Sequence, residues 1–149
     1  PYVAGQSELG RTPQLLPLAV GDRLLLLGYS YDRESAASGE EWRVTTYWQV
    51  QESDRLDEPL AIFVHALDEA NHLLMGWDGL HTAVQSWRPG DVFIQIHALH
   101  VPPQAAPGVY RVELGVYSPA SLERLPIYTG QGETTAPHSR LLLAPLEIR

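Results

Sequence analysis

The stretch that decides the fold class is Trp42–Gln51, WRVTTYWQVQ. Its side chains alternate in character over ten residues, and a period of two is typical of a β-strand with one packed face and one wet face. The side chains expected on the packed face are Trp42, Val44, Thr46, Trp48 and Val50. Those expected on the wet face are Arg43, Thr45, Tyr47, Gln49 and Gln51.

Short apolar runs lie on both sides of this stretch, and Gly, Pro, Asp or Asn closes nearly all of them within about ten residues. Further strands are predicted at 24–31, 60–67, 72–77, 92–99, 109–117, 125–128 and 140–148. Connections of helical length are missing, which disfavours a parallel sheet. The pattern predicts an all-β, antiparallel sandwich of two sheets, immunoglobulin-like or jelly-roll-like, with roughly seven to nine strands.

One domain is expected to span residues 1–149, because the chain has the length of a single ordinary domain. Residues 1–19, which contain Pro13 and Pro17, are predicted to be an extended lead-in segment. The alternation within the strands gives a predicted core of Leu25, Leu27, Val44, Trp48, Ile62, Val64, Ile94, Ile96, Tyr110, Val112, Leu114 and Val116.

The charge balance and the lack of cysteine exclude several classes of function. Eighteen acidic residues against ten basic ones give a net charge of -8, and no Arg cluster offsets it, so nucleic acid is excluded as a partner. With no Cys in the chain, disulfides, thiolate zinc sites, iron–sulfur clusters and cysteine nucleophiles are excluded too.

The hydropathy of the chain predicts a domain that is itself soluble. Uninterrupted apolar runs such as Leu24–Leu27 are far shorter than the roughly 20 residues of a membrane-spanning helix. The chain starts at Pro1 and its single Met is Met75, which favours a fragment or a processed product of a larger protein.

Several turn-and-strand motifs follow one another in a recognisable order. They are Gly21–Tyr29 (GDRLLLLGY), Thr46–Gln49 (TYWQ), Phe63–Asp68 (FVHALD), Trp87–Asp91 (WRPGD), Pro107–Val112 (PGVYRV), Gly115–Tyr117 (GVY) and Arg124–Pro126 (RLP). Their order and spacing resemble the C-terminal β-sandwich domain of bacterial membrane glycosyltransferases of the protein mannosyltransferase type. The resemblance covers roughly residues 20–148.

This resemblance implies a noncatalytic accessory domain on the extracytoplasmic face of a bacterial membrane. The implied partner is the transmembrane part of the same parent protein, which carries the lipid-linked sugar chemistry in that family. The resemblance transfers no catalytic residue and no cofactor to this chain.

Six histidines raise the question of a metal site, and the spacing argues against one. His97 and His100 are three residues apart, so on one strand they point to opposite faces unless a bulge intervenes. His65 and His97 could meet across neighbouring strands, with Asp68 as a third ligand. Structural histidines are the favoured interpretation, and neither a metal nor a cofactor is predicted.

Catalysis has weaker support than binding. The acidic residues gather in loops, where carboxylates are usually solvated, whereas a glycosidase needs two of them across a cleft. A Ser-His-Asp hydrolase remains a distant third hypothesis, because the chain has no Gly-x-Ser-x-Gly nucleophile turn.

Carbohydrate binding is the alternative to the accessory-domain hypothesis. β-Sandwiches can present Trp and Tyr rings to the apolar faces of sugars, while polar side chains bind the hydroxyl groups. The candidate ligand-binding residues are Trp77, Asp78, His81, Trp87, Arg88 and Tyr47. Burial of the two tryptophans would argue against this hypothesis.

Overall fold

The computed structural model describes residues 17–54, 58–128 and 136–149. Its regular structure is β, apart from two single 3-10 turns at Val84–Ser86 and Pro137–Ser139. The strands are β1 (Leu18–Val20), β2 (Leu24–Tyr31), β3 (Ser35–Ala36), β4 (Glu41–Val50), β5 (Ala61–Leu67), β6 (Leu73–Gly79), β7 (Val92–His100), β8 (Gly108–Tyr117), β9 (Ile127–Tyr128), β10 (Leu141–Leu142) and β11 (Leu146–Ile148). The predicted all-β sandwich is confirmed.

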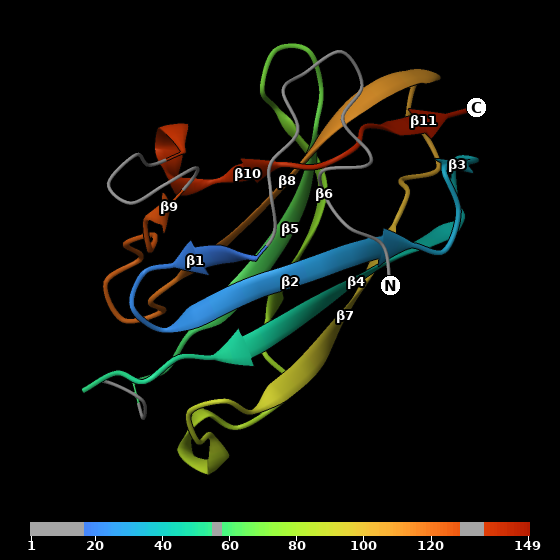
Figure 1. Ribbon diagram of the computed structural model, residues 1–149. Helices are drawn as coiled ribbons and strands as arrows, with labels where there is room; N and C mark the ends of the chain where they lie inside the picture. Colours follow the sequence, from blue (N-terminus) through green and yellow to red (C-terminus); the bar gives the residue numbers. More distant parts are fainter. Residues whose placement is uncertain (1–16, 55–57, 129–135) are drawn as a thin grey trace.

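Two sheets form the layers of the sandwich (Figure 1). The first sheet has the strand order β7-β4-β2-β1-β9, and the second has the order β3-β11-β8-β5-β6, with β10 also paired to β8. The chain changes sheet in the connections β2–β3, β3–β4, β4–β5, β6–β7, β7–β8, β8–β9 and β9–β10. The sheets are therefore interlocked by the order in which the chain visits them.

The structure differs from the prediction in strand number and in one strand pair. Eleven strands form instead of seven to nine, because five of them are pieces of two or three residues. The strand expected over 140–148 is divided into β10 and β11 around Pro145, which cannot donate a ladder hydrogen bond. β11 pairs in parallel with β3, so the second sheet is not wholly antiparallel.

The C-terminal segment is held to the first sheet by two tyrosines of β2. The hydroxyl of Tyr31 donates to the carbonyl of Ala144 at 2.5 Å, and the amide of Ala144 donates to the hydroxyl of Tyr29 at 3.0 Å. The predicted lead-in is described only from residue 17 onward, where Leu18–Val20 form β1 between β2 and β9. Residues 1–16 of that prediction lie outside the described residues.

The core lies between the sheets and contains most of the side chains predicted for it. Trp42 and Trp48 are fully buried. The predictions for Val44, Trp48, Ile62, Val64, Tyr110, Val112, Leu114 and Val116 are confirmed.

Two core predictions on β2 are wrong by one residue. Leu24 and Leu26 are buried, whereas Leu25 and Leu27 are half-exposed. Four consecutive leucines carry no alternation, so the run itself cannot indicate which leucines face inward. The pairing with β4 sets the register, since Leu26 lies opposite the inward-facing Trp48.

The core predictions for Ile94 and Ile96 on β7 are also wrong. These two isoleucines and Val92 are 54%, 41% and 61% exposed. The alternate residues Gln95 and His97 are fully buried instead. The middle of β7 is therefore inverted relative to its hydrophobic pattern, with Ile94 and Ile96 outside and Gln95 and His97 inside, whereas Leu99 is buried and Phe93 packs against the core.

Candidate functional site

The buried side of the inverted strand β7 holds a chain of polar contacts. The Trp48 indole Nε1 donates to the Thr46 hydroxyl oxygen at 2.7 Å, and Thr46 Oγ1 lies 3.0 Å from His97 Nε2. Thr46 and Trp48 lie on β4, where Thr46 pairs with Gln95 in register. A polar layer thus replaces the apolar core at this edge of the sandwich.

His97 is held as a neutral ring in this layer. Burial lowers the pKa of His97 to about 3, and the neighbouring His81 acts in the same direction. The carboxylate of Asp78 and the backbone of Trp77 oppose the shift. The buried Nδ1 of His97 has no hydrogen-bond partner with standard geometry.

Two of the predicted ligand-binding residues, Trp77 and His81, meet at the rim of this layer. The Trp77 ring contacts the His81 ring edge-on, with 5.0 Å between centroids, and contacts His97 in the same way at 5.2 Å. Gln95 fixes the loop here, because its Oε1 accepts from the His81 backbone amide and its Nε2 lies 3.0 Å from His81 Nδ1. The Trp77 ring is half-buried against the core.

Asp78 follows Trp77 on β6, so it points to the opposite face of the second sheet. Its carboxylate lies 2.7 Å from His65 Nε2 and accepts a hydrogen bond from the Tyr117 hydroxyl at 3.0 Å. Asp78 is thus separated from Trp77 and His81. It belongs to a second cluster, whose members lie far apart in the sequence.

This second cluster, the His65 network, consists of His65, Asp78, Glu113, Tyr117, Arg124 and Arg140. Glu113 is its centre and is only 3% exposed. One of its oxygens accepts from Arg140 Nη1 at 2.5 Å, and the other lies 3.6 Å from His65 Nδ1 and 3.9 Å from Arg124 Nη2. Arg124 also stacks over the Phe63 ring at 4.6 Å.

Two glycines make room for the rings of this network. A Cβ at Gly76 would come within 2.6 Å of the His65 ring, and one at Gly115 would come within 2.4 Å of the Phe63 ring. Both glycines lie directly opposite these rings in the sheet register. The glycines therefore let the two rings lie close to the sheet.

The network sets the charge states of its members. Burial opposes ionisation of Glu113, but its contacts with His65 and Arg140 and the charge of Arg124 lower the pKa of Glu113 overall. Burial also lowers the pKa of His65, yet Glu113 and Asp78 outweigh it and raise the pKa of His65 overall. The network therefore favours an imidazolium between two carboxylates.

We expect His65→Gln to remove a pH-dependent part of the stability. The contribution of His65 is complete below its unfolded pKa of about 6.5 and is lost as the pH rises through its higher folded pKa. The wild type should therefore exceed the variant in unfolding free energy by more at about pH 6 than at about pH 9. Urea denaturation at both pH values measures this difference.

The wild type has to be compared with the variant at each pH, because His97 changes the unfolding free energy with pH in the opposite direction. Its lowered folded pKa makes the protein less stable as the pH falls from about 6.5 toward 3. His100→Gln, at an exposed residue on β7, is the matched control. An equal difference between wild type and His65→Gln at both pH values would contradict the prediction.

The remaining predicted ligand-binding residues lie elsewhere. Trp87 is buried and stacks on Phe93 at 5.0 Å, while Arg88 beside it is exposed. Tyr47 lies on the outer face of the first sheet, where its hydroxyl is 3.3 Å from Ser30 Oγ. The structure thus joins Trp77 to His81 but does not bring the six residues into one site.

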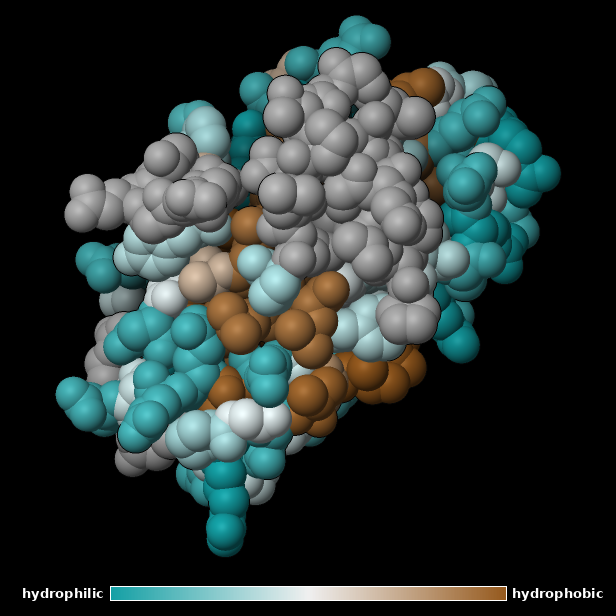
Figure 2. Space-filling view, in the orientation of Figure 1, coloured by the Kyte–Doolittle hydropathy of each residue, from teal (hydrophilic) through white to brown (hydrophobic). Residues whose placement is uncertain are grey.

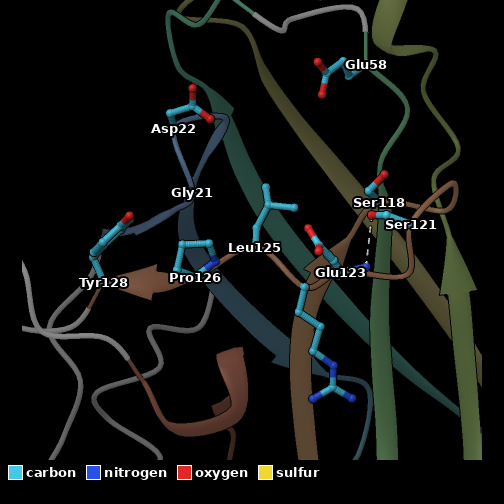
Figure 3. Close-up of a pocket in the computed structure, with 10 residues that line it drawn as sticks. Gly21, Asp22, Glu58, Ser118, Ser121, Glu123, Leu125, Pro126 and Tyr128 are labelled. Atoms are coloured by element: carbon cyan, nitrogen blue, oxygen red, sulfur yellow. Dashed lines mark hydrogen bonds between the residues drawn. The ribbon is translucent and has the colours of Figure 1, made fainter.

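A polar pocket of about 380 Å³ opens at the end of the sandwich (Figure 3). In Figure 3, Asp22 and Tyr128 lie on one side of Leu125, with Ser121 and Glu123 on the other. The full lining is Gly21, Asp22, Glu58, Ser118, Ser121, Glu123, Arg124, Leu125, Pro126 and Tyr128. Arg124 connects this pocket to the His65 network.

The outer face of the first sheet carries an apolar patch. Figure 2 shows apolar side chains gathered over the strands of this sheet. We define the outer patch as Leu25, Leu27, Tyr47, Val92, Ile94 and Ile96. In the sheet register Tyr47 lies opposite both Gly28 and Ile94, so the patch runs across β2, β4 and β7.

The histidine arrangement agrees with only part of the sequence analysis. His97 is buried and His100 is exposed, which confirms that they face opposite ways. The possible meeting of His65 and His97 on neighbouring strands does not occur, because β5 and β7 belong to different sheets. Across residues 17–54, 58–128 and 136–149, no three His, Asp or Glu side chains form a group that could hold a metal ion.

Comparison with known proteins does not assign the domain to a family. No protein-family model matches the sequence, and no curated protein is significantly similar to it. Within the part of the chain that the structure describes, no helix is long and apolar enough to cross a membrane.

Proposed function

We propose that this chain is a noncatalytic accessory domain of a larger membrane protein, a glycosyltransferase, on the extracytoplasmic side of a bacterial membrane. In this proposal the domain docks against another part of the same parent protein. The order of motifs from Gly21 to Pro126 supports the family, and the outer patch is the observation that supports docking.

The outer patch favours docking because it exposes apolar side chains of a strand whose alternation would ordinarily bury them. Alternation on β7 could have buried its isoleucines, yet the fold exposes them and buries Gln95 and His97. Among the described residues, three of the six exposed large hydrophobic side chains lie on this one strand. An apolar concentration of this kind is typical of an interaction surface.

A photo-crosslinker placed at Tyr47 in the full-length parent protein tests the docking proposal. We expect a crosslink between this position and another region of the same polypeptide, mapped by mass spectrometry. The matched control is Val109, which is 65% exposed on the second sheet and should give no such crosslink. Equal crosslinking from both positions, or none from Tyr47, would contradict docking through the outer patch.

The polar pocket supports carbohydrate binding as a second candidate function. Its volume lies within the range of small-ligand sites, and its carboxylates, hydroxyls and guanidinium suit a ligand rich in hydroxyl groups. Trp77 and His81 remain a separate candidate contact. The burial of Trp87 removes one of the two aromatic platforms that the sequence suggested.

A glycan array separates these two carbohydrate sites. If the pocket binds sugar, Glu123→Gln should abolish retention and Trp77→Ala should leave it unchanged; the opposite result would favour the Trp77–His81 contact. Glu147→Gln on the exposed side of β11 is the control. If the wild type binds no glycan on a broad array, carbohydrate binding at either site is contradicted.

A further inference from the structure

β7 is an edge strand of the first sheet, and the side-chain amide of its Gln95 donates to the Ile96 carbonyl at 3.0 Å. It lies at the end of the strand order and pairs on one side only, with β4 (Figure 1). It is nine residues long, and its sequence, VFIQIHALH, contains no Pro, Lys, Arg, Asp or Glu. Monomeric proteins usually blunt such an edge with charges, prolines or short strands, because its free backbone groups can pair with another chain.

The other edges of the described sheets carry these protections. β9 and β3, which end the first and second sheets, have two residues each. β6, the other edge of the second sheet, contains the charged Asp78 as well as Gly76 and Gly79. Within the described residues, β7 is thus the one long edge strand without such a device.

The sequence of β7 is complementary to itself in an antiparallel alignment. With Ile94 opposite the partner's Ile96, Val92 falls opposite the partner's Ala98. All the facing outer side chains in this stretch are then apolar. Aromatic and β-branched neighbours across an antiparallel pair stabilise it by about 0.2–1 kcal/mol each. On the inner side, Gln95 falls opposite the partner's Gln95.

The charges at the ends of β7 fit the same alignment. Asp91, directly before the strand, falls opposite the partner's Leu99 and so lies beside the partner's His100. The strand therefore begins beside the Asp91 carboxylate and ends at the His100 imidazole. In a two-fold antiparallel pair, the carboxylate of each copy lies beside the imidazole of the other copy, so this contact forms twice. A parallel alignment would place like groups together at both ends.

We propose that two copies of this chain form a two-fold homodimer in which β7 pairs antiparallel with β7 of the second copy. The two first sheets then form one continuous sheet, and the three exposed β7 side chains of each copy become part of a longer apolar stripe. This inference rests on backbone pairing at the edge of β7, whereas the accessory-domain proposal uses the outer face of the sheet; the two share the side chains of Val92, Ile94 and Ile96, and hydrogen exchange in β7 distinguishes them. Two-fold pairing of identical surfaces is the commonest form of protein oligomer.

Sedimentation equilibrium over a range of concentrations tests the dimer. We expect Ile94→Lys combined with Ile96→Lys to raise the dimer Kd by about 100-fold, about tenfold for each substitution. Both positions are exposed, so the fold should remain intact, as near-ultraviolet circular dichroism of the tryptophans can check. Val109→Lys, at a comparably exposed strand residue, is the matched control and should leave the dimer Kd unchanged.

Salt and hydrogen exchange give two independent readouts. Each copy carries a net charge of -8, so added salt should strengthen the dimer by screening the repulsion between copies. The lysine substitutions reduce that repulsion, so loss of the dimer in the double variant cannot be an effect of net charge. Amides of β7 should exchange more slowly as the protein concentration rises.

Three results would overturn the proposal. The first is a monomer at the highest concentration in the presence of salt. The second is a dimer that survives in the Ile94→Lys and Ile96→Lys double variant. The third is a dimer without slowed exchange in β7, which would indicate packing through the outer face or another surface.

Discussion

Trp48→Ala is expected to lower the unfolding free energy by about 3–5 kcal/mol, the range measured when large aromatic side chains are removed from cores. Trp48 is fully buried, and it lies between Leu26 of β2 and Phe93 of β7 in the sheet register. Its loss leaves a cavity at the centre of the first sheet. It also leaves the Thr46 hydroxyl without its indole donor, next to the buried His97.

Two controls separate the cavity from the hydrogen bond. Trp48→Phe keeps most of the volume but removes the indole N–H, so it should cost less than Trp48→Ala. Tyr47→Ala changes the residue before Trp48, which is half-exposed on the other face of β4. It should also lower the unfolding free energy much less than Trp48→Ala does. Urea denaturation followed by circular dichroism gives all three values, and a Trp48→Ala variant as stable as Tyr47→Ala would contradict the burial of this indole.

Glu113→Ala is expected to cost about 3–5 kcal/mol, because removing one member of a buried ion pair leaves the others without compensation. The carboxylate of Glu113 is nearly inaccessible to solvent and contacts Arg140, Arg124 and His65. Without it, three cationic groups would face one another beside β8. Arg140 would also lose the contact that fastens the segment before β10 to the sheet.

The matched control for this prediction is Glu147→Ala. Glu147 is exposed on β11, so its removal should change the unfolding free energy by no more than about 0.5 kcal/mol. Glu113→Gln adds a second comparison, since it keeps the shape but removes the charge. The prediction fails if Glu113→Ala and Glu147→Ala unfold at the same urea concentration.

The long strands could be predicted because their alternation or their turns are visible locally. Trp42–Val50 shows a clear period of two, and Asp68–Asn71 marks the turn between β5 and β6. The four leucines of β2 show no period, so their inward pair depends on Val50 and Trp48 of the neighbouring strand. β7 shows a clear period but the wrong face, because pairing with β4 outweighs the burial preference of Ile94 and Ile96.

The His65 network could not be predicted from the positions of its members along the chain. The register of β5 and β6 shifts between Ala66 and Leu67, and this irregularity decides that His65 lies opposite Gly76 and near Asp78. Glu113 reaches His65 only because β8 pairs with the other side of β5. The sequence hypothesis grouped Asp78 with Trp77 and His81, but adjacent residues of a strand face opposite ways.

The parallel pairing of β3 with β11 has a consequence for how the protein is made. Ser35 and Ala36 have no β11 to pair with until Glu147 and Ile148 have left the ribosome. Tyr29 and Tyr31 of β2 likewise cannot form their hydrogen bonds with Ala144 until Ala144 has been synthesised. Synthesis proceeds at about 5–20 residues per second, so the nascent domain spends seconds with these edges open, and its final closure follows translation of the last strand.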